Sequence, residues 1–254
     1  MHARAERWLQ TVPGLGDRRL QVAYARSELY DATIAQAAEA LDDLSVAAEE
    51  GHITARDVLG AFVPVLIDNE HIQRVWAIRT TALASDFLGA TRLLRASTPD
   101  GHLLDKKAEG MVIEQAGRPL TLGERRALAR RPSRANMDRL MRDPHPMVAA
   151  ILLKSPRITE EDVVRMAAFR PSNPLIQIEI AKTWSHHKRV RRTIVLNPGS
   201  PPAVSVPMLS LLVRPELLEA SRAADLAAIV RATAMELWEL RPPMAPAEPP
   251  ELPH

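Results

Sequence analysis

A helical unit that occurs twice, once from His145 and again from His187, constrains the fold of this chain more than any other feature of its sequence. The matched pairs are His145 with His187, Val148 with Val190, Leu153 with Val195, Pro156 with Pro198 and Met166 with Met208. A period of about 40 residues is typical of stacked helical repeats. The repeat therefore predicts an architecture, and it does not by itself predict an activity.

Signals at the helix ends support the same interpretation. Thr159, with Asp162 three residues later, is close to a capping box. Asn173 precedes Pro174, and Ser200 likewise precedes a proline, so each is a capping residue before a proline at the first helical position. The predicted helices are roughly 9–13 residues long, and isolated helices of that length are marginal in water. They must therefore be held by their neighbours, as in a stack of repeats.

Composition favours a helical, globular protein. Apolar residues make up 46% of the chain and aromatic residues only 4%, whereas sheets prefer aromatic and β-branched residues. The absence of cysteine excludes disulfides, thiolate nucleophiles and cysteine-ligated metal sites. No apolar run reaches about 18 residues, and the N-terminus lacks the apolar core of a signal peptide. We expect no membrane association and a cytoplasmic location.

The remaining helices are predicted from apolar periodicity and breaker residues. Thr121 and Glu124 form a second capping box. Residues 17–50 are expected to form one helix or a tight helical pair that ends at Gly51. The next helix is expected to be capped by Thr54 and to kink or break at Pro64. Further helices are expected over 70–82, 84–97, 102–116 and 223–240. Residues 241–254 contain six prolines and are expected to form a disordered or polyproline-like tail.

The run from Leu120 to Leu240 resembles bacterial helical-repeat proteins of the HEAT/armadillo-like kind. The resemblance is carried by SPRITEEDVVRMAAFRP, NPLIQIEIAKTW and RVRRTIVLNPGSPP. It implies a curved α-solenoid that binds other macromolecules, with no shared catalytic residues. We therefore predict an all-α protein with three parts: a helical N-terminal half (1–117), HEAT/armadillo-like repeats (118–240) and a disordered proline-rich tail (241–254).

Charge is distributed unevenly along the chain, although the net charge is only +2. Residues 27–50 carry seven acidic residues and no Lys or Arg, whereas residues 118–142 carry eight arginines and two acids. The arginine-rich segment has two interpretations. It can bind phosphates or an acidic partner, or it has no binding role and is either a solvated outer face or paired with the acidic segment of the same chain.

A second basic cluster spans residues 186–192, where Arg189 and Arg192 share one helical face that could line a groove. Its two adjacent histidines point in different directions and make a poor metal pair. The candidate partner-binding residues are Arg125, Arg126, Arg130, Arg131, Arg134, Lys188, Arg189 and Arg192.

Asp68, Glu70 and His71 lie close enough in the sequence for acid–base chemistry, but they also fit the end of one helix and the start of the next. We predict no catalytic, cofactor-binding or metal-binding residues. The preferred function is a non-enzymatic protein–protein interaction or scaffold module whose partner has an acidic surface. The alternative is a nucleic-acid-binding repeat protein that uses the arginine-rich face, and a helical-repeat enzyme acting on a large substrate ranks third.

Overall fold

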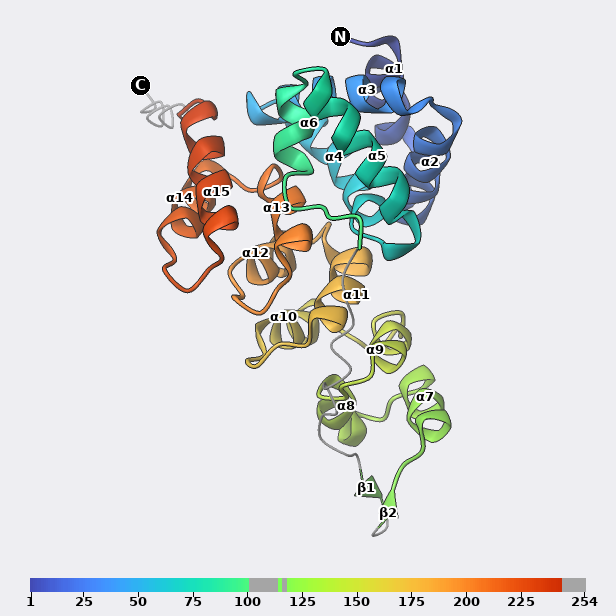
Figure 1. The fold of residues 1–254 in the computed structure, drawn as a ribbon. Helices are drawn as coiled ribbons and strands as arrows, with labels where there is room; N and C mark the ends of the chain where they lie inside the picture. Colours follow the sequence, from blue (N-terminus) through green and yellow to red (C-terminus); the bar gives the residue numbers. More distant parts are fainter. Residues whose placement is uncertain (101–113, 116–117, 244–254) are drawn as a thin grey trace, which may run out of the picture.

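The computed structural model describes residues 1–100, 114–115 and 118–243. This part of the chain forms fifteen α-helices, two short 3₁₀ helices and one two-stranded hairpin (Figure 1). The hairpin pairs β1 (Glu114–Gln115) with β2 (Arg118–Pro119) in antiparallel register. The prediction of an all-α protein is therefore confirmed.

The N-terminal helices pack around α3. The elements are α1 (Ala3–Thr11), η1 (Val12–Gly14), α2 (Arg18–Asp31), α3 (Ile34–Glu49), α4 (Ile53–Leu66), η2 (Asn69–His71), α5 (Ile72–Ala84) and α6 (Leu88–Leu93). Helix α3 contacts α1, α4, α5 and α6, because five of its buried residues are alanines and let neighbours approach closely. Gly51 ends α3 with a φ of +99°, a conformation that favours glycine.

The later helices lie in two rows. They are α7 (Leu122–Arg130), α8 (Arg134–Met141), α9 (Pro146–Leu152), α10 (Glu160–Ala168), α11 (Pro174–Trp184), α12 (Lys188–Val195), α13 (Pro202–Leu209), α14 (Arg214–Arg222) and α15 (Ala228–Leu240). Helix α9 contacts α7 and α11, α13 contacts α11 and α15, and α10 contacts α12. In each of these pairs a helix packs on the helix two positions along the chain, whereas α14 packs on its sequence neighbour α15. Figure 1 shows the series running from α7, far from the N-terminal helices, back to α15 beside them.

The sequence repeat and the packing unit differ. The repeat that starts at His145 and His187 relates α9 to α12 and α10 to α13, so each sequence unit spans three helices and joins one row to the other. Packing instead joins α9 to α11 and α10 to α12, so the packing unit spans two helices. Two asparagines mark this shorter unit: the Nδ2 of Asn173 donates to the Pro144 carbonyl at 2.8 Å, and that of Asn197 donates to the Ala167 carbonyl at 2.7 Å.

A buried arginine joins the two halves of the molecule. The Arg241 guanidinium donates to Ala48 O and Ser210 O at 3.0 Å, and also to Leu212 O and Glu49 O. These carbonyls lie at the C-terminal ends of α3 and α13, where the helix dipoles favour a cation. Burial is the main cause that lowers the pKa of Arg241 to about 10, so the group stays charged at neutral pH.

Several predicted boundaries need correction. Helix α4 begins directly after His52, so Thr54 is inside the helix and does not cap it, and Pro64 lies near the end of one continuous helix. Helix α13 begins after Pro201, so Ser200 is not its N-cap, and the last helix begins at Ala228. The predicted helix 102–116 falls mostly outside the described residues, although residues 114–115 are a strand. The predicted tail starts too early because Arg241 is buried, and residues 244–254 lie outside the described part.

Replacing Arg241 with methionine removes hydrogen bonds to four carbonyls that stay buried. We expect Arg241→Met to lower the free energy of unfolding by about 3 kcal/mol, measured by chemical denaturation. Arg222→Met is the control because Arg222 is exposed in α14, and it should change stability by less than about 0.5 kcal/mol. Equal stability of the two variants would contradict the bridging role of Arg241.

Gly89 lets α6 approach α3 closely. A Cβ atom at this position would lie 2.9 Å from the Asp42 carbonyl oxygen, which is backbone and cannot move cheaply. We expect Gly89→Ala to destabilise the protein by roughly 1–3 kcal/mol in the same measurement. Gly123 occupies the same second position of α7, but a Cβ there meets nothing closer than 3.9 Å. Gly123→Ala should therefore be neutral or slightly stabilising, and a comparable loss in both variants would argue against close packing at Gly89.

Candidate functional site

A cleft of about 880 Å³ lies where the N-terminal helices meet the later ones. Its charged lining residues are Arg18, Arg56, Asp57, Lys188, Arg191 and Glu216, and His186 lies beside them. Apolar lining residues, including Ile53, Val58 and Leu211, separate these charges. We call this site the cationic cleft, because four of its six charged groups are positive.

Four helices direct their N-terminal turns at the cationic cleft. Arg18 is the first residue of α2, Lys188 is the first of α12, Arg56 is in the first turns of α4, and Glu216 is the third residue of α14. The N-caps of α4 and α12 make no side-chain hydrogen bond to the helix backbone. Helix N-termini carry a partial positive charge and free N–H groups. The backbone and the side chains thus favour the same ligand, an anion.

Within the described part of the chain, the cations of the cleft form no ion pair with a carboxylate. Among the described residues, no carboxylate lies within 4.0 Å of the charged nitrogens of Arg18, Arg56, Lys188 or Arg191. Asp57 and Glu216 act on them from farther away. Like charges that face one another without a counter-ion repel, so binding of an anion would lower the energy of the cleft.

Two of these arginines are held in place by the fold. Arg18 donates to the Gly60 carbonyl and, at 3.1 Å, to Gln21 Oε1. Arg191 donates to the Ser185 carbonyl at 3.0 Å. Burial, and then the charge of Arg191, lowers the pKa of Arg18 to about 10, and burial also lowers the pKa of Arg191. Both remain charged at neutral pH.

His186 contributes no charge to the cationic cleft at neutral pH. Desolvation of part of its ring, followed by the nearby His187, Arg18 and Arg191, lowers its pKa to about 4. The residue as a whole is exposed, and its ring stacks near Trp184, with 6.3 Å between the ring centroids. A neutral imidazole can still donate or accept a hydrogen bond.

The structure separates the candidate partner-binding residues of the sequence. Only Lys188 lines the cationic cleft. Arg125 is mostly buried and pairs with Asp143 at 2.6 Å. The other three paired candidates connect successive helices of the row formed by α8, α10, α12 and α14: Arg134 to Asp162 at 3.8 Å, Arg189 to Glu161 at 2.7 Å and Arg192 to Glu219 at 2.7 Å.

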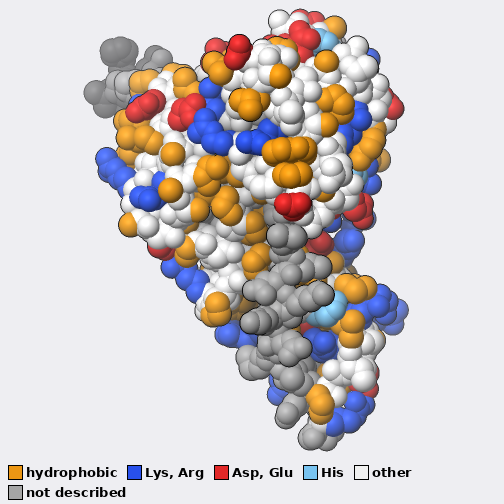
Figure 2. Space-filling view, in the orientation of Figure 1, with side chains coloured by type: hydrophobic (Ala, Val, Ile, Leu, Met, Phe, Trp, Pro, Cys, Tyr) orange, Lys and Arg blue, Asp and Glu red, His pale blue; other side chains and the backbone are white. Residues whose placement is uncertain are grey.

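The three remaining candidates lie on α7 or directly after it. Arg130 and Arg131 are exposed, and Arg126 is half-buried. Figure 2 shows Lys and Arg side chains at several separate places on the face drawn rather than in one continuous stripe. Because Arg118, Arg125 and Arg134 pair with carboxylates, the arginine-rich segment 118–142 is not a single unpaired surface.

The two oppositely charged segments do not pair with each other within the described residues. Arginines of 118–142 pair with Glu124, Asp143 and Asp162. Acids of 27–50 pair elsewhere, as with Glu28, which pairs with Arg4 and Arg7, and Glu49, which pairs with Arg92. Pairing between the acidic segment 27–50 and the arginine-rich segment 118–142, which the sequence left open, is therefore excluded for the described residues of both segments.

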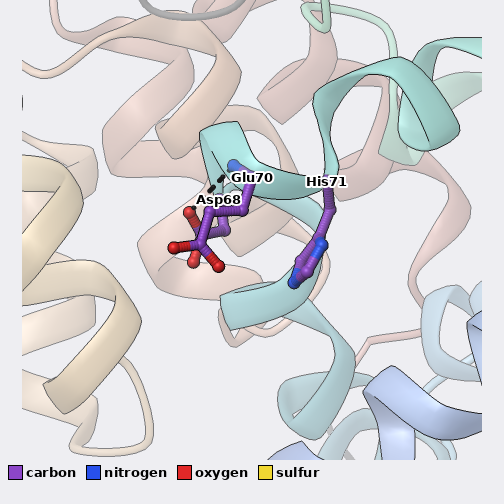
Figure 3. A group of neighbouring side chains, drawn as sticks. All are labelled: Asp68, Glu70 and His71. Atoms are coloured by element: carbon purple, nitrogen blue, oxygen red, sulfur yellow. Dashed lines mark hydrogen bonds between the residues drawn. The ribbon is translucent and has the colours of Figure 1, made fainter.

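Asp68, Glu70 and His71 lie together at the start of α5, and their ligand atoms are within 4.8 Å of one another (Figure 3). A cation already occupies this group, because Lys182 Nζ lies 2.8 Å from Asp68 Oδ2. Burial of Lys182 opposes its charge, but the carboxylates of Asp68 and Glu179 outweigh that effect and raise its pKa. A metal ion would have to displace this ammonium group, so the contact is better understood as a link between η2 and α11.

Arg18, Arg56 and Arg191 were missed as binding residues in the sequence. They lie in three segments that no local spacing connects; Arg18 adjoins only one other basic residue, Arg19, and Arg56 adjoins Asp57. Arg191 belongs to the 186–192 cluster, but the face chosen there contained Arg189 and Arg192. The useful signal would have been the helix starts, since Arg18 and Lys188 are both first residues of a helix.

Comparison with protein-family models, curated proteins and solved structures found no match to this chain. The HEAT/armadillo-like resemblance therefore stays a prediction. In the described part of the chain, no helix is long and apolar enough to cross a membrane.

Removing Lys182 should destabilise the protein, since Asp68 is buried and would lose its counter-ion. We expect Lys182→Met to lower the free energy of unfolding by about 2–3 kcal/mol, measured by denaturant titration. Arg192→Met also removes one side of an ion pair, but the partners are 47% and 43% exposed, so it should cost no more than about 1 kcal/mol. A smaller loss for Lys182→Met than for Arg192→Met would show that the Asp68 contact is not a structural link.

Proposed function

We propose that this chain is a non-enzymatic protein–protein interaction module that receives an acidic segment of another protein in the cationic cleft. In this proposal, residues 118–240 are a HEAT/armadillo-like α-solenoid and the N-terminal helices close one side of the binding site. The observation that carries the proposal is the set of four cations around one cleft without a carboxylate partner among the described residues. Some surface arginines elsewhere, such as Arg189 and Arg192, are paired. Arg130 and Arg131 are exposed without a carboxylate partner among the described residues, but they do not line the cleft.

The packing of the later helices supports the solenoid part of the proposal. Each of these helices is short, and helices two positions apart in the chain contact one another. Repeats that contact mainly their neighbours form extended surfaces, which repeat proteins use for binding. The ion pairs along α8, α10, α12 and α14 neutralise part of the charge of that row. None of the four cations of the cleft has such a pair with a carboxylate of the described residues.

The mixed lining of the cleft supports a peptide segment as the ligand. Ile53 is 68% exposed and lines the cleft beside the cations. A segment with both acidic and apolar side chains would match both kinds of lining. Aromatic side chains that stack bases in single-strand binding proteins do not occur among the described lining residues.

A peptide-binding assay tests this function. The probe is a short fluorescein-labelled peptide of alternating glutamate and leucine, and the readout is fluorescence anisotropy at several salt concentrations. We expect the triple variant Arg56→Gln/Lys188→Gln/Arg191→Gln to bind at least about tenfold more weakly than the wild type. The matched control is Arg130→Gln/Arg131→Gln/Arg139→Gln, which removes the same amount of charge from exposed residues at the end of α7, directly after it and in α8. This control should keep wild-type affinity.

Two outcomes would contradict the proposal: no binding of the peptide, or equal loss in both triple variants, which would indicate non-specific charge attraction. Duplex DNA and single-stranded RNA oligonucleotides are measured in the same series. Tight nucleic-acid binding that falls steeply with salt and is lost in the Arg130/Arg131/Arg139 control variant would favour the nucleic-acid alternative.

A further inference from the structure

The charges of the cationic cleft leave an excess that a single carboxylate does not balance. Arg18, Arg56, Lys188 and Arg191 supply four positive charges, Asp57 and Glu216 supply two negative ones, and His186 is neutral. The excess of two positive charges equals the charge of about −1.5 to −2 that a phosphate monoester carries at pH 7. One glutamate or aspartate side chain would neutralise half of it.

The donors also approach from more than one side. Arg18 is on α2, Arg56 on α4, and Lys188 and Arg191 on α12. A carboxylate has two oxygens in one plane, and one guanidinium fork can contact both of them. A phosphate monoester has three terminal oxygens in a tetrahedral arrangement and accepts several charged donors at once. Donors that converge from three helices therefore fit phosphate geometry better than carboxylate geometry.

The backbone adds to this preference. The first turns of α4 and α12 reach the cleft without a side-chain cap, so their N–H groups are available to an anion. Arg18 and Arg191 are already fixed by hydrogen bonds to backbone carbonyls. Preorganised donors lose little conformational entropy on binding.

From these observations we infer that the cationic cleft binds a phosphate group carried on a segment of a partner protein, so that phosphorylation of the partner controls docking. The inference rests on the proposed function and specifies the ligand of the same cleft. The phosphate contacts the guanidinium groups of Arg56 and Arg191 and the ammonium group of Lys188, and Arg18 adds its charge beside them. The apolar residues around Ile53 contact the side chains that flank the phosphorylated residue.

The test compares three labelled peptides that differ at one central position, which is serine, glutamate or phosphoserine; the flanking residues alternate glutamate and leucine. Anisotropy is measured at near-physiological salt with the full chain. We expect the phosphoserine peptide to bind at least about tenfold more tightly than the glutamate peptide. Arg191→Lys keeps the charge but loses the guanidinium fork, so it should reduce this preference while glutamate-peptide binding changes little.

The outcomes separate the two proposals. Equal affinity for the glutamate and phosphoserine peptides would overturn the phosphate inference and leave the acidic-segment proposal standing. Absence of binding by all three peptides would overturn both. Loss of the phosphoserine preference in Arg56→Gln/Lys188→Gln/Arg191→Gln, but not in Arg130→Gln/Arg131→Gln/Arg139→Gln, would support the cleft as the site.

Competition with inorganic phosphate and pyrophosphate identifies the source of the phosphate group. We expect both anions to displace the phosphoserine peptide only at far higher concentration than the peptide's own dissociation constant, because they lack the apolar contacts. Displacement by pyrophosphate at concentrations equal to or below that constant would overturn the partner-segment inference in favour of a small phosphorylated molecule. Circular dichroism melts of each variant exclude unfolding as the cause of lost binding.

Discussion

The arrangement of the two halves depends on one buried cation. The Arg241 guanidinium completes the C-terminal ends of α3 and α13 together, and α3 is the helix on which the N-terminal bundle packs. Carbonyl groups at a buried helix end need donors, and a charged donor suits the negative end of a helix dipole. One side chain thus fixes α13 relative to α3. Across the same junction, Arg92 and Arg95 both form salt bridges with Glu236 of α15.

This junction also creates the cationic cleft. Helices α2 and α4 come from one half and α12 and α14 from the other, and their N-terminal turns meet there. Neither half alone contains all four cations. The positive charge is therefore a product of how the halves dock, and a partner bound in the cleft would touch both. Binding at such a junction can also strengthen it, because a ligand that contacts only the docked arrangement favours that arrangement.

Elsewhere, several arginines of the chain form ion pairs within it. Arginines and acids two helices apart connect α8, α10, α12 and α14, and most of these pairs are exposed and individually weak. Their regular spacing lets them fix the register between neighbouring helices, since each arginine meets an acid of the next helix in the row. The buried pairs Arg125–Asp143 and Lys182–Asp68 are different, because each removes a buried charge that would otherwise be unpaired.

The sequence by itself determined the helices and many of their ends. The capping boxes at Thr121 and Thr159 and the Asn173-Pro174 start were predicted and are present, because a cap is formed by residues only two or three positions apart. The tertiary structure decided which helices touch. The sequence repeat spans three helices, but α7, α9, α11, α13 and α15 pack on one another in turn, since contact depends on the row in which a helix lies. The tertiary structure also formed the cleft, which brings together Arg18, Arg56 and Arg191 from three distant segments. It likewise determined the role of Arg241, whose carbonyl partners lie on α3 and after α13. No local pattern encodes such contacts, because they exist only once the chain has folded back on itself.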